Sequence, residues 1–183
     1  MALDSVNYSL YLATDKQPIE QVYLQTFSDA ESEAEGLVIA KLVTELLETT
    51  AVDELFTFVA TQNGQVIACI MFSKLTFEQP INAWLLSPVA VLTQYQRKGI
   101  GQQLLTFGLQ YLAEQKTELV FTYGDPNYYC KVGFNCVSET VVKAPMPLSF
   151  PEGWLGLSLV SEHVPAISGF SSCVAAFNKP EIW

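Results

Sequence analysis

Three stretches of the chain have the residue pattern of helices. Pro18 falls in the first turn of a stretch that extends to about residue 27, a position where the N–H that proline lacks would have no partner. Apolar residues return at helical spacing over residues 37–48. The longest stretch, residues 98–115, carries two adjacent rows of apolar residues, which predicts a helix with one broad buried face.

Between and after these helices the pattern is that of β-strands. Residues 55–61 and 66–72 flank Asn63-Gly64, and an Asn-Gly pair between two such runs is the strongest short signal of a β-hairpin. Further strands are predicted over residues 8–13, 83–92, 119–123 and 135–142. Pro88 lies inside one of them and cannot donate a hydrogen bond to a neighbouring strand, which indicates a bulge or a sheet edge.

The order of these elements predicts a mixed α/β fold. A chain of 183 residues fits one domain, and 50% of its residues are apolar, so one sizeable core can be built. We expect residues 1–183 to form that single domain, with a C-terminal extension rich in Pro, Ser and Gly from about residue 143.

Composition excludes several classes of function. The net charge of −10, from 19 acidic and 9 basic residues, works against nucleic acid or an anionic membrane as the main partner, because both need clustered cations. Four cysteines without CxxC spacing and a single histidine argue against a zinc site. Neither a signal peptide nor a membrane-spanning stretch is visible, so the sequence predicts a cytoplasmic protein with reduced thiols.

Candidate chemistry concentrates in one turn, Gln96-Arg-Lys-Gly-Ile-Gly101, which joins a predicted strand to the longest helix. Free N–H groups at the start of a helix favour an anion, phosphate above all, and glycine lets the backbone approach it closely. Arg97 is the only arginine of the chain, and Lys98 follows it directly. The turn matches neither a GxxxxGK[ST] P-loop nor a GxGxxG Rossmann fingerprint, and its spacing alone also fits a tight turn without a ligand.

Two separated segments resemble the GCN5-related N-acetyltransferase (GNAT) superfamily. Gln96 to Gly101 matches its Q/R-x-x-G-x-G/A signature, and Tyr129-Cys-Lys-Val-Gly-Phe134 resembles its Tyr-x-x-x-Gly-Phe element. The element order agrees from residue 8 to about residue 142, and residues 124–134, followed by a Pro-rich tail, are similar to the YhbS-like branch. Thr93 departs from the common pattern, because a proline often stands there.

The resemblance implies a GNAT fold, in which a mixed central sheet with splayed parallel strands is flanked by helices. It also implies direct transfer of an acetyl group from acetyl-CoA to a primary amine, without a metal. The strand before the signature would hold the pantetheine and the thioester, and the turn would hold the diphosphate. The residues carried over are Val89, Ala90 and Val91 in the strand, and Gln96, Arg97, Lys98, Gly99, Ile100 and Gly101 in the turn. Tyr129 would protonate the leaving CoA thiolate, with Tyr128 as the alternative if the register differs by one.

The amine acceptor and the general base remain open. Candidates for the base are Glu45, Glu48, Asp53, Glu54 and Glu78. We expect a surface or capping role for His163, and no nucleophilic role for Cys130, because the family transfers the acetyl group directly. The alternatives to an enzyme are a non-catalytic acyl-CoA-binding sensor and, from the apolar residues of the tail, a structural interaction domain. Pairing of tail strands between subunits leaves a homodimer open.

Overall fold

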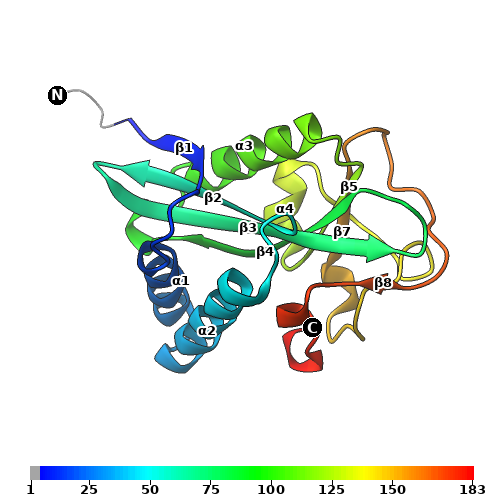
Figure 1. Ribbon diagram of the computed structural model, residues 1–183, viewed down its shortest axis with the longest axis horizontal. Helices are drawn as coiled ribbons and strands as arrows, with labels where there is room; N and C mark the ends of the chain where they lie inside the picture. The colour runs from blue at the N-terminus through cyan, green and yellow to red at the C-terminus, as the bar shows by residue number, and fades with distance from the viewer. Residues whose placement is uncertain (1–4) are drawn as a thin grey trace. The chain divides into compact units, whose positions relative to one another are not determined.

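The structure is a computed structural model, and it describes residues 5–183 (Figure 1). Its helices are α1 (Gln17–Ala30), α2 (Glu33–Thr49), α3 (Ile100–Glu114) and the single turn α4 (Pro126–Tyr129). Its strands are β1 (Asn7–Leu10), β2 (Leu55–Gln62), β3 (Gln65–Phe77), β4 (Ala83–Val91), β5 (Leu119–Tyr123), β6 (Asn135–Cys136), β7 (Trp154–Ser158) and β8 (Ser171–Ser172). The chain divides into two compact units, residues 1–71 with 88–109, and residues 72–87 with 110–183. The division falls within β3, β4 and α3.

In the first unit the strands run in the order β1-β2-β3-β4, with β1 antiparallel to β2. The predicted hairpin is confirmed: Asn63 and Gly64 have φ of 52° and 77°, as a primed two-residue turn requires. In Figure 1, α1 and α2 lie together on one side of these strands, and α3 lies on the other side. Phe107 of α3 packs edge-on against Phe58 of β2, with ring centroids 6.0 Å apart.

Helix α2 explains part of the acidic N-terminal region. Ser32 caps it, since its Oγ accepts a hydrogen bond from the Glu35 backbone N–H at 3.2 Å. Glu33 and Glu35 lie in the first turn, where the positive end of the helix dipole stabilises carboxylates. These acids therefore have a structural role at the start of the helix.

In the second unit the order is β3-β4-β5-β7-β6, and β8 pairs with β3. β4 and β5 are parallel through residues 83–86 and 119–122, whereas β7 is antiparallel to both β5 and β6. The sheet is therefore mixed, and the α/β prediction is confirmed. Phe121 of β5 and Trp154 of β7 stack in the core, with ring centroids 5.1 Å apart.

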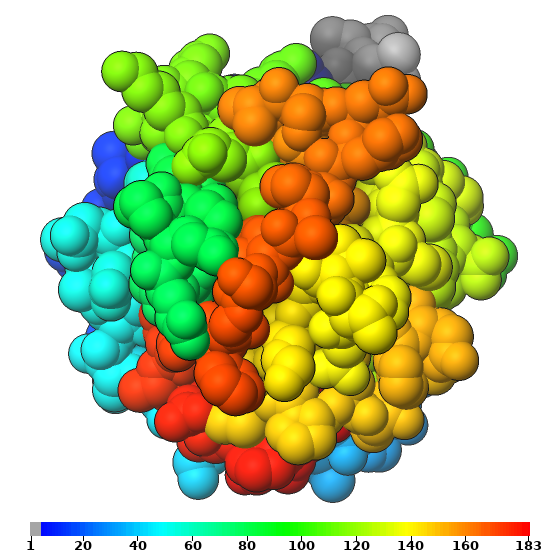
Figure 2. Space-filling model, turned by 90° about the vertical axis from the view of Figure 1, so that its right-hand side faces the viewer, coloured from blue at the N-terminus to red at the C-terminus, as the bar shows by residue number. Residues whose placement is uncertain are grey.

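The Pro-rich tail belongs to the packed part of this second unit. It supplies β7, the partner of β5, and β8, the partner of β3. Figure 2 shows the tail, in orange and red, crossing the surface between the green end of β3 and the yellow segment that follows β5. Ser171 Oγ donates to the Lys143 carbonyl at 2.7 Å, and the Phe170 N–H donates to the Glu78 carboxylate at 3.4 Å.

Two predicted strands are shorter than expected. The strand predicted over residues 135–142 ends at Cys136, because a local turn replaces it: Ser138 Oγ accepts from the Thr140 N–H at 3.2 Å. The strand predicted over residues 8–13 ends at Leu10.

The prediction of the longest helix over residues 98–115 also needs correction. This helix, α3, begins at Ile100 and not at residue 98, because the preceding turn is not helical. With 15 residues it is shorter than α2, which has 17. Pro88 lies just beyond the part of β4 that pairs with β5, because that parallel pairing stops at Leu86. In the first unit, to which Pro88 belongs, β4 is the last strand, so the predicted position at a sheet edge fits.

Candidate cofactor site

The turn between β4 and α3 has a backbone that alternates in handedness. Arg97 has φ of 60° and Gly99 has φ of 79°, whereas Lys98 and Ile100, between and after them, are not in the positive-φ region. Alternation of this kind points successive N–H groups toward one concave side, which is a common binding site for anions. The left-handed conformation is unfavourable for a residue with a side chain, so the turn accepts strain at Arg97.

The N–H groups of this turn have no protein partner. Within residues 5–183, no backbone carbonyl or side chain accepts a hydrogen bond from the N–H of residues 97–102. The first bond into the helix is donated by the Gln103 N–H to the Gly99 carbonyl at 3.0 Å. The helix dipole adds positive potential at the same point. The backbone of residues 97–102 therefore fits an anion with several oxygen atoms, such as a diphosphate.

The two cations of the turn have different surroundings. Arg97 and Lys98 are both exposed, but the Lys98 Nζ lies over the ring of Tyr95, 5.4 Å from its centroid. Lys98 also lines a cavity of about 330 Å³, together with Tyr8, Tyr95 and Gln103 among others. The Tyr8 hydroxyl donates to Gln103 Oε1 at 2.9 Å and closes part of its wall. Lys98 thus lies at the edge of a cavity in the first unit, beside the turn.

Two side chains hold the turn in place. Gln96 Nε2 donates to the Val91 carbonyl at 2.9 Å, so this side chain ties the turn to the end of β4. Thr93 Oγ1 donates to Asp29 Oδ2 of α1 at 2.7 Å, and this bond links the turn to a different element. The family resemblance implies that Gln96 contacts the cofactor, and Thr93 is only a departure from the family pattern. The sequence carries no signal for Asp29, because its partner is 64 positions away.

The strand segment before the turn is held by a buried tyrosine of α1. The hydroxyl of Tyr23 lies 2.8 Å from the Pro88 carbonyl of β4 and 3.1 Å from the Cys69 carbonyl of β3. It therefore donates at the point where the predicted pantetheine segment, Val89 to Val91, begins. Ala90 is buried, and Val89 and Val91 are partly exposed. Tyr23 occurs on the apolar face of a helix, so the pattern indicates its burial but not the hydrogen bonds of its hydroxyl.

Tyr129 belongs to the second unit, at the end of the short helix α4. Its ring packs edge-on against Phe134, with centroids 5.9 Å apart, so the first and last residues of the Tyr-x-x-x-Gly-Phe element are in contact. Its ring also lies so close to Gly124 that a Cβ there would be 2.9 Å from the Tyr129 Cε2. Burial raises the pKa of Tyr129 to about 12, although a hydrogen bond with Thr122 opposes the shift. Burial also raises the pKa of Tyr128 above its ordinary value.

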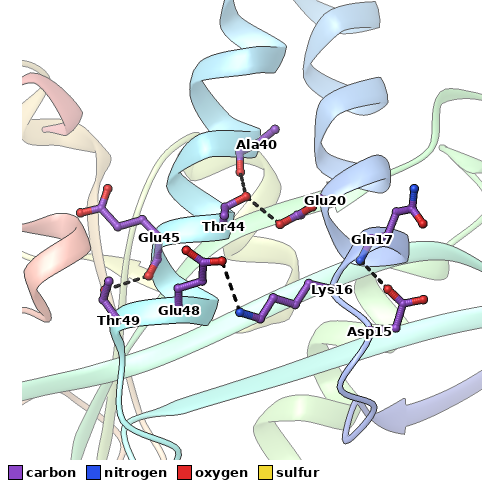
Figure 3. A network of polar contacts seen from close by, with 9 residues as sticks. All are labelled: Asp15, Lys16, Gln17, Glu20, Ala40, Thr44, Glu45, Glu48 and Thr49. Atoms are coloured by element: carbon purple, nitrogen blue, oxygen red, sulfur yellow. Dashed lines mark hydrogen bonds and ion pairs between the residues drawn. The ribbon is translucent and has the colours of Figure 1, made fainter.

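The carboxylates named as candidate bases lie in different elements of the structure. Glu48 pairs with Lys16 at 3.6 Å, and Figure 3 shows the carboxylate of Glu45, on the same helix, pointing away from that pair. Both residues belong to α2 of the first unit. Asp53 and Glu54 are exposed in the segment before β2. These four residues stay candidates.

Other residues singled out in the sequence lie in the second unit. Glu78 approaches Gly169 and Phe170 of the tail, with its carboxylate accepting the Phe170 N–H, so it supports the tail. His163 is largely exposed and lies 3.9 Å from Glu162, in keeping with a surface role. Cys130 is exposed and unpaired. Among residues 5–183 no three His, Cys, Asp or Glu side chains are grouped as a metal would require.

Comparisons with known proteins place the chain in a family. The family model described as the acetyltransferase (GNAT) domain matches residues 53–136, which include both the turn and the Tyr129 element. The uncharacterized N-acetyltransferase YjhQ of Escherichia coli K12 is 30% identical over 142 residues, which are 73% of this chain and 77% of YjhQ. The chain belongs to the GNAT acetyltransferase family. The GNAT protein YhbS of the same strain is 35% identical over 121 residues, 64% of this chain and 68% of YhbS.

Solved structures of GNAT proteins have the same fold. The crystal structure of YhbS from Escherichia coli, in complex with CoA, superposes with a TM-score of 0.78 and 26% identity, covering 95% of this chain and 92% of that one. A GNAT acetyltransferase from Brucella melitensis, at 24% identity, shares the fold with a TM-score of 0.73 over 95% of this chain and 99% of that one. The predicted GNAT fold and the likeness to YhbS are confirmed. No helix within residues 5–183 is both long and apolar enough to span a bilayer.

Proposed function

We propose that this GNAT protein is an N-acetyltransferase that moves the acetyl group of acetyl-CoA directly to a primary amine. The observation that carries the proposal is the backbone of residues 97–102, whose N–H groups have no protein partner and follow a turn of alternating handedness. The turn places Arg97 and Lys98 side by side in a chain of net charge −10, which suits a diphosphate. The CoA complex of YhbS, a relative with the same fold, supports the choice of ligand.

In this proposal the first unit binds the donor. The N–H groups from Arg97 to Gly101 hold the diphosphate, and the side chains of Arg97 and Lys98 add charge around it. The backbone of Val89, Ala90 and Val91 holds the pantetheine and donates to the oxyanion that develops when the amine attacks the thioester. A single preorganised donor of this kind is worth about 3–4 kcal/mol in other enzymes. Acetyl-CoA supplies the activated acetyl group, and thiolate is its leaving group.

Tyr129 donates to that thiolate. A tyrosine whose pKa is raised to about 12 remains protonated throughout the neutral range, so it is always available as a donor. A thiol has an ordinary pKa of about 8.5, so complete transfer of the phenolic proton to the thiolate would be uphill. We therefore assign Tyr129 a hydrogen-bond donor role that stabilises the departing sulfur, with the proton itself supplied by solvent or by the attacking amine.

For the amine acceptor we propose only its charge, which is positive. Helices α1 and α2 carry Glu20, Glu45 and Glu48, and an acidic surface raises the local concentration of cationic amines. Glu20 is already engaged, since it accepts a hydrogen bond from Thr44 Oγ1 at 2.7 Å, and Glu48 pairs with Lys16 (Figure 3). The base that deprotonates the amine stays open among Glu45, Glu48, Asp53 and Glu54. The cytoplasmic location and a homodimer also stay predictions.

The test has a binding step and a turnover step. Acetyl-CoA at a hundred times its Kd should stabilise the protein by about 2.7 kcal/mol, a rise of very roughly 5–10 °C in Tm for a chain of this size. A panel of amines, with free CoA detected through its thiol, then measures turnover. Binding without turnover on the whole panel would favour the sensor, and absence of binding would refute the donor site itself.

A pair of variants tests the role of Tyr129. Tyr129→Phe keeps the ring and removes the hydroxyl, so it should bind acetyl-CoA normally and lose kcat by about tenfold or more. Tyr128→Phe is the matched control, because it makes the same change at the neighbouring residue and should leave kcat within twofold (about 0.4 kcal/mol). If Tyr128→Phe loses kcat and Tyr129→Phe does not, the register is displaced by one residue.

A further inference from the structure

The hydrogen bond between Asp29 and Thr93 is the starting point for a further inference about the diphosphate turn. Thr93 begins the 3₁₀ turn Thr93–Tyr95, which leads directly into Gln96. Its hydroxyl donates to the Asp29 carboxylate of α1 at 2.7 Å. A second side-chain hydrogen bond of residues 93–99, from Gln96 Nε2 to the Val91 carbonyl, reaches the adjacent end of β4. The Thr93 bond is the one of these two that connects the segment to α1, which is distant in the sequence.

The position of Asp29 is unfavourable for the helix itself. It is the penultimate residue of α1, and the negative end of a helix dipole destabilises a carboxylate there. It is also exposed, so burial of a side chain does not explain the residue. The bond from Thr93 is the interaction that gives this carboxylate a favourable partner. α1 thus holds the chain on both sides of Val89–Val91, through Tyr23 at Pro88 and through Asp29 at Thr93.

The backbone around Thr93 shows what the bond does. Leu92, before it, has ψ of 137°, outside the α region that a following proline disfavours. Thr93 is the first residue of the 3₁₀ turn, where proline is well tolerated. The Thr93 N–H donates to no backbone carbonyl within residues 5–183. The backbone at Thr93 is therefore compatible with proline, but no ring fixes the φ of this residue, and its hydroxyl holds the turn through Asp29 instead.

We propose that Asp29 and Thr93 are positioning residues for the cofactor, which hold the turn so that its N–H groups already converge before acetyl-CoA binds. The inference rests on the proposed function of the turn. A preorganised site loses less conformational entropy on binding, so the pair should affect affinity for CoA and leave the chemical step unchanged. Asp29 and Thr93 touch neither the acetyl group nor the amine in this scheme.

The experiment measures the Kd for CoA by calorimetry and kcat at saturating acetyl-CoA. Thr93→Val keeps the shape and removes the hydroxyl, and one net hydrogen bond corresponds to a rise in Kd of about three- to tenfold. Asp29→Ala should raise the Kd equally, and the double variant should be no worse than either single one, because both changes remove the same bond. Thr93→Pro should restore the Kd to within about twofold of the original chain, by fixing φ covalently.

Thr106→Val is the matched control. Its hydroxyl is also exposed and donates a hydrogen bond, at 2.9 Å to the Gln102 carbonyl, but that bond lies within α3. It should leave the Kd unchanged. An unchanged Kd in Thr93→Val, or additive effects in the double variant, would overturn the inference while the CoA site stands. Failure of the original chain to bind CoA at all would overturn the proposed function and this inference with it.

Discussion

Two glycines with nearly the same φ allow a direct test of the turn. Gly99 has φ of 79° and lies in the diphosphate turn, and Gly64 has φ of 77° and lies in the hairpin between β2 and β3. A Cβ at Gly64 would meet no atom within 4 Å, and one at Gly99 would meet only Gln103 Nε2, at an ordinary 3.7 Å. Replacement by alanine therefore introduces backbone strain at both positions without a steric clash.

The two substitutions should cost nearly the same stability. A left-handed conformation costs an L-residue about 1–2 kcal/mol. Alanine recovers roughly 0.4–1 kcal/mol of that through the unfolded chain, so a net loss of about 1 kcal/mol is expected for Gly99→Ala and for Gly64→Ala. For a chain of this length that is a fall of about 2–4 °C in Tm, which differential scanning calorimetry resolves.

The Kd for CoA should differ between the two variants. In Gly99→Ala the strain is relieved by moving φ out of the left-handed region, and that movement turns an N–H away from the common point. Loss of one charge-assisted hydrogen bond corresponds to about tenfold or more in Kd for CoA. Gly64→Ala should bind CoA as the original chain does. Equal CoA affinities in the two variants, at equal loss of Tm, would refute the argument that the left-handed residue in the turn serves the ligand.

Two further predictions concern the second unit. Burial raises the pKa of Tyr129 from 10 to about 12, so the folded state binds this proton more tightly than the unfolded state and stability falls as pH rises between those values. The free energy of unfolding, measured by urea denaturation at pH 9, 10 and 11, should therefore fall more steeply in the original chain than in Tyr129→Phe. Equal slopes in the two proteins would contradict the assignment. Trp183 is 6% exposed, and its ring stacks on Tyr123 with centroids 5.8 Å apart. Trp183→Ala should therefore lower the free energy of unfolding by about 3 kcal/mol in the same denaturation experiment. Val160→Ala is the control, because Val160 is 67% exposed, and it should change the free energy of unfolding by less than about 0.5 kcal/mol.

Local signals in the sequence predict most of the fold because each depends on neighbouring residues. Asn63-Gly64 forces a primed turn, and the apolar rows that begin at Ile100 produce the buried face of α3. The strand predicted to reach residue 142 failed for an equally local reason, the hydrogen bonds of the Ser138 side chain, which compete with strand pairing. Boundaries are thus decided by single side chains that a hydrophobic pattern does not weigh.

The candidate site is predictable only in part. The motif identifies Gly99 because the backbone needs a left-handed residue there, and the sequence also indicates two cations. It does not show that Arg97 is itself left-handed, since that strain depends on the whole turn. Tyr23 and Asp29 were missed because their partners, Pro88 and Thr93, are more than sixty residues away in the chain. Contacts of that range follow from how α1 packs, which a single sequence does not record.

The pairing of β5 with β7 also has a consequence for the order in which the protein is made. Leu119 to Thr122 are fully buried in the finished sheet, yet the strand that covers one side of them, Trp154–Ser158, is translated more than thirty residues later. A nascent chain whose residues 119–123 have left the ribosome before residues 154–158 therefore exposes an apolar strand with an unpaired edge, which is a hazard for aggregation. The second unit closes only late in synthesis, whereas the hairpin and the first two helices can assemble as they emerge from the ribosome.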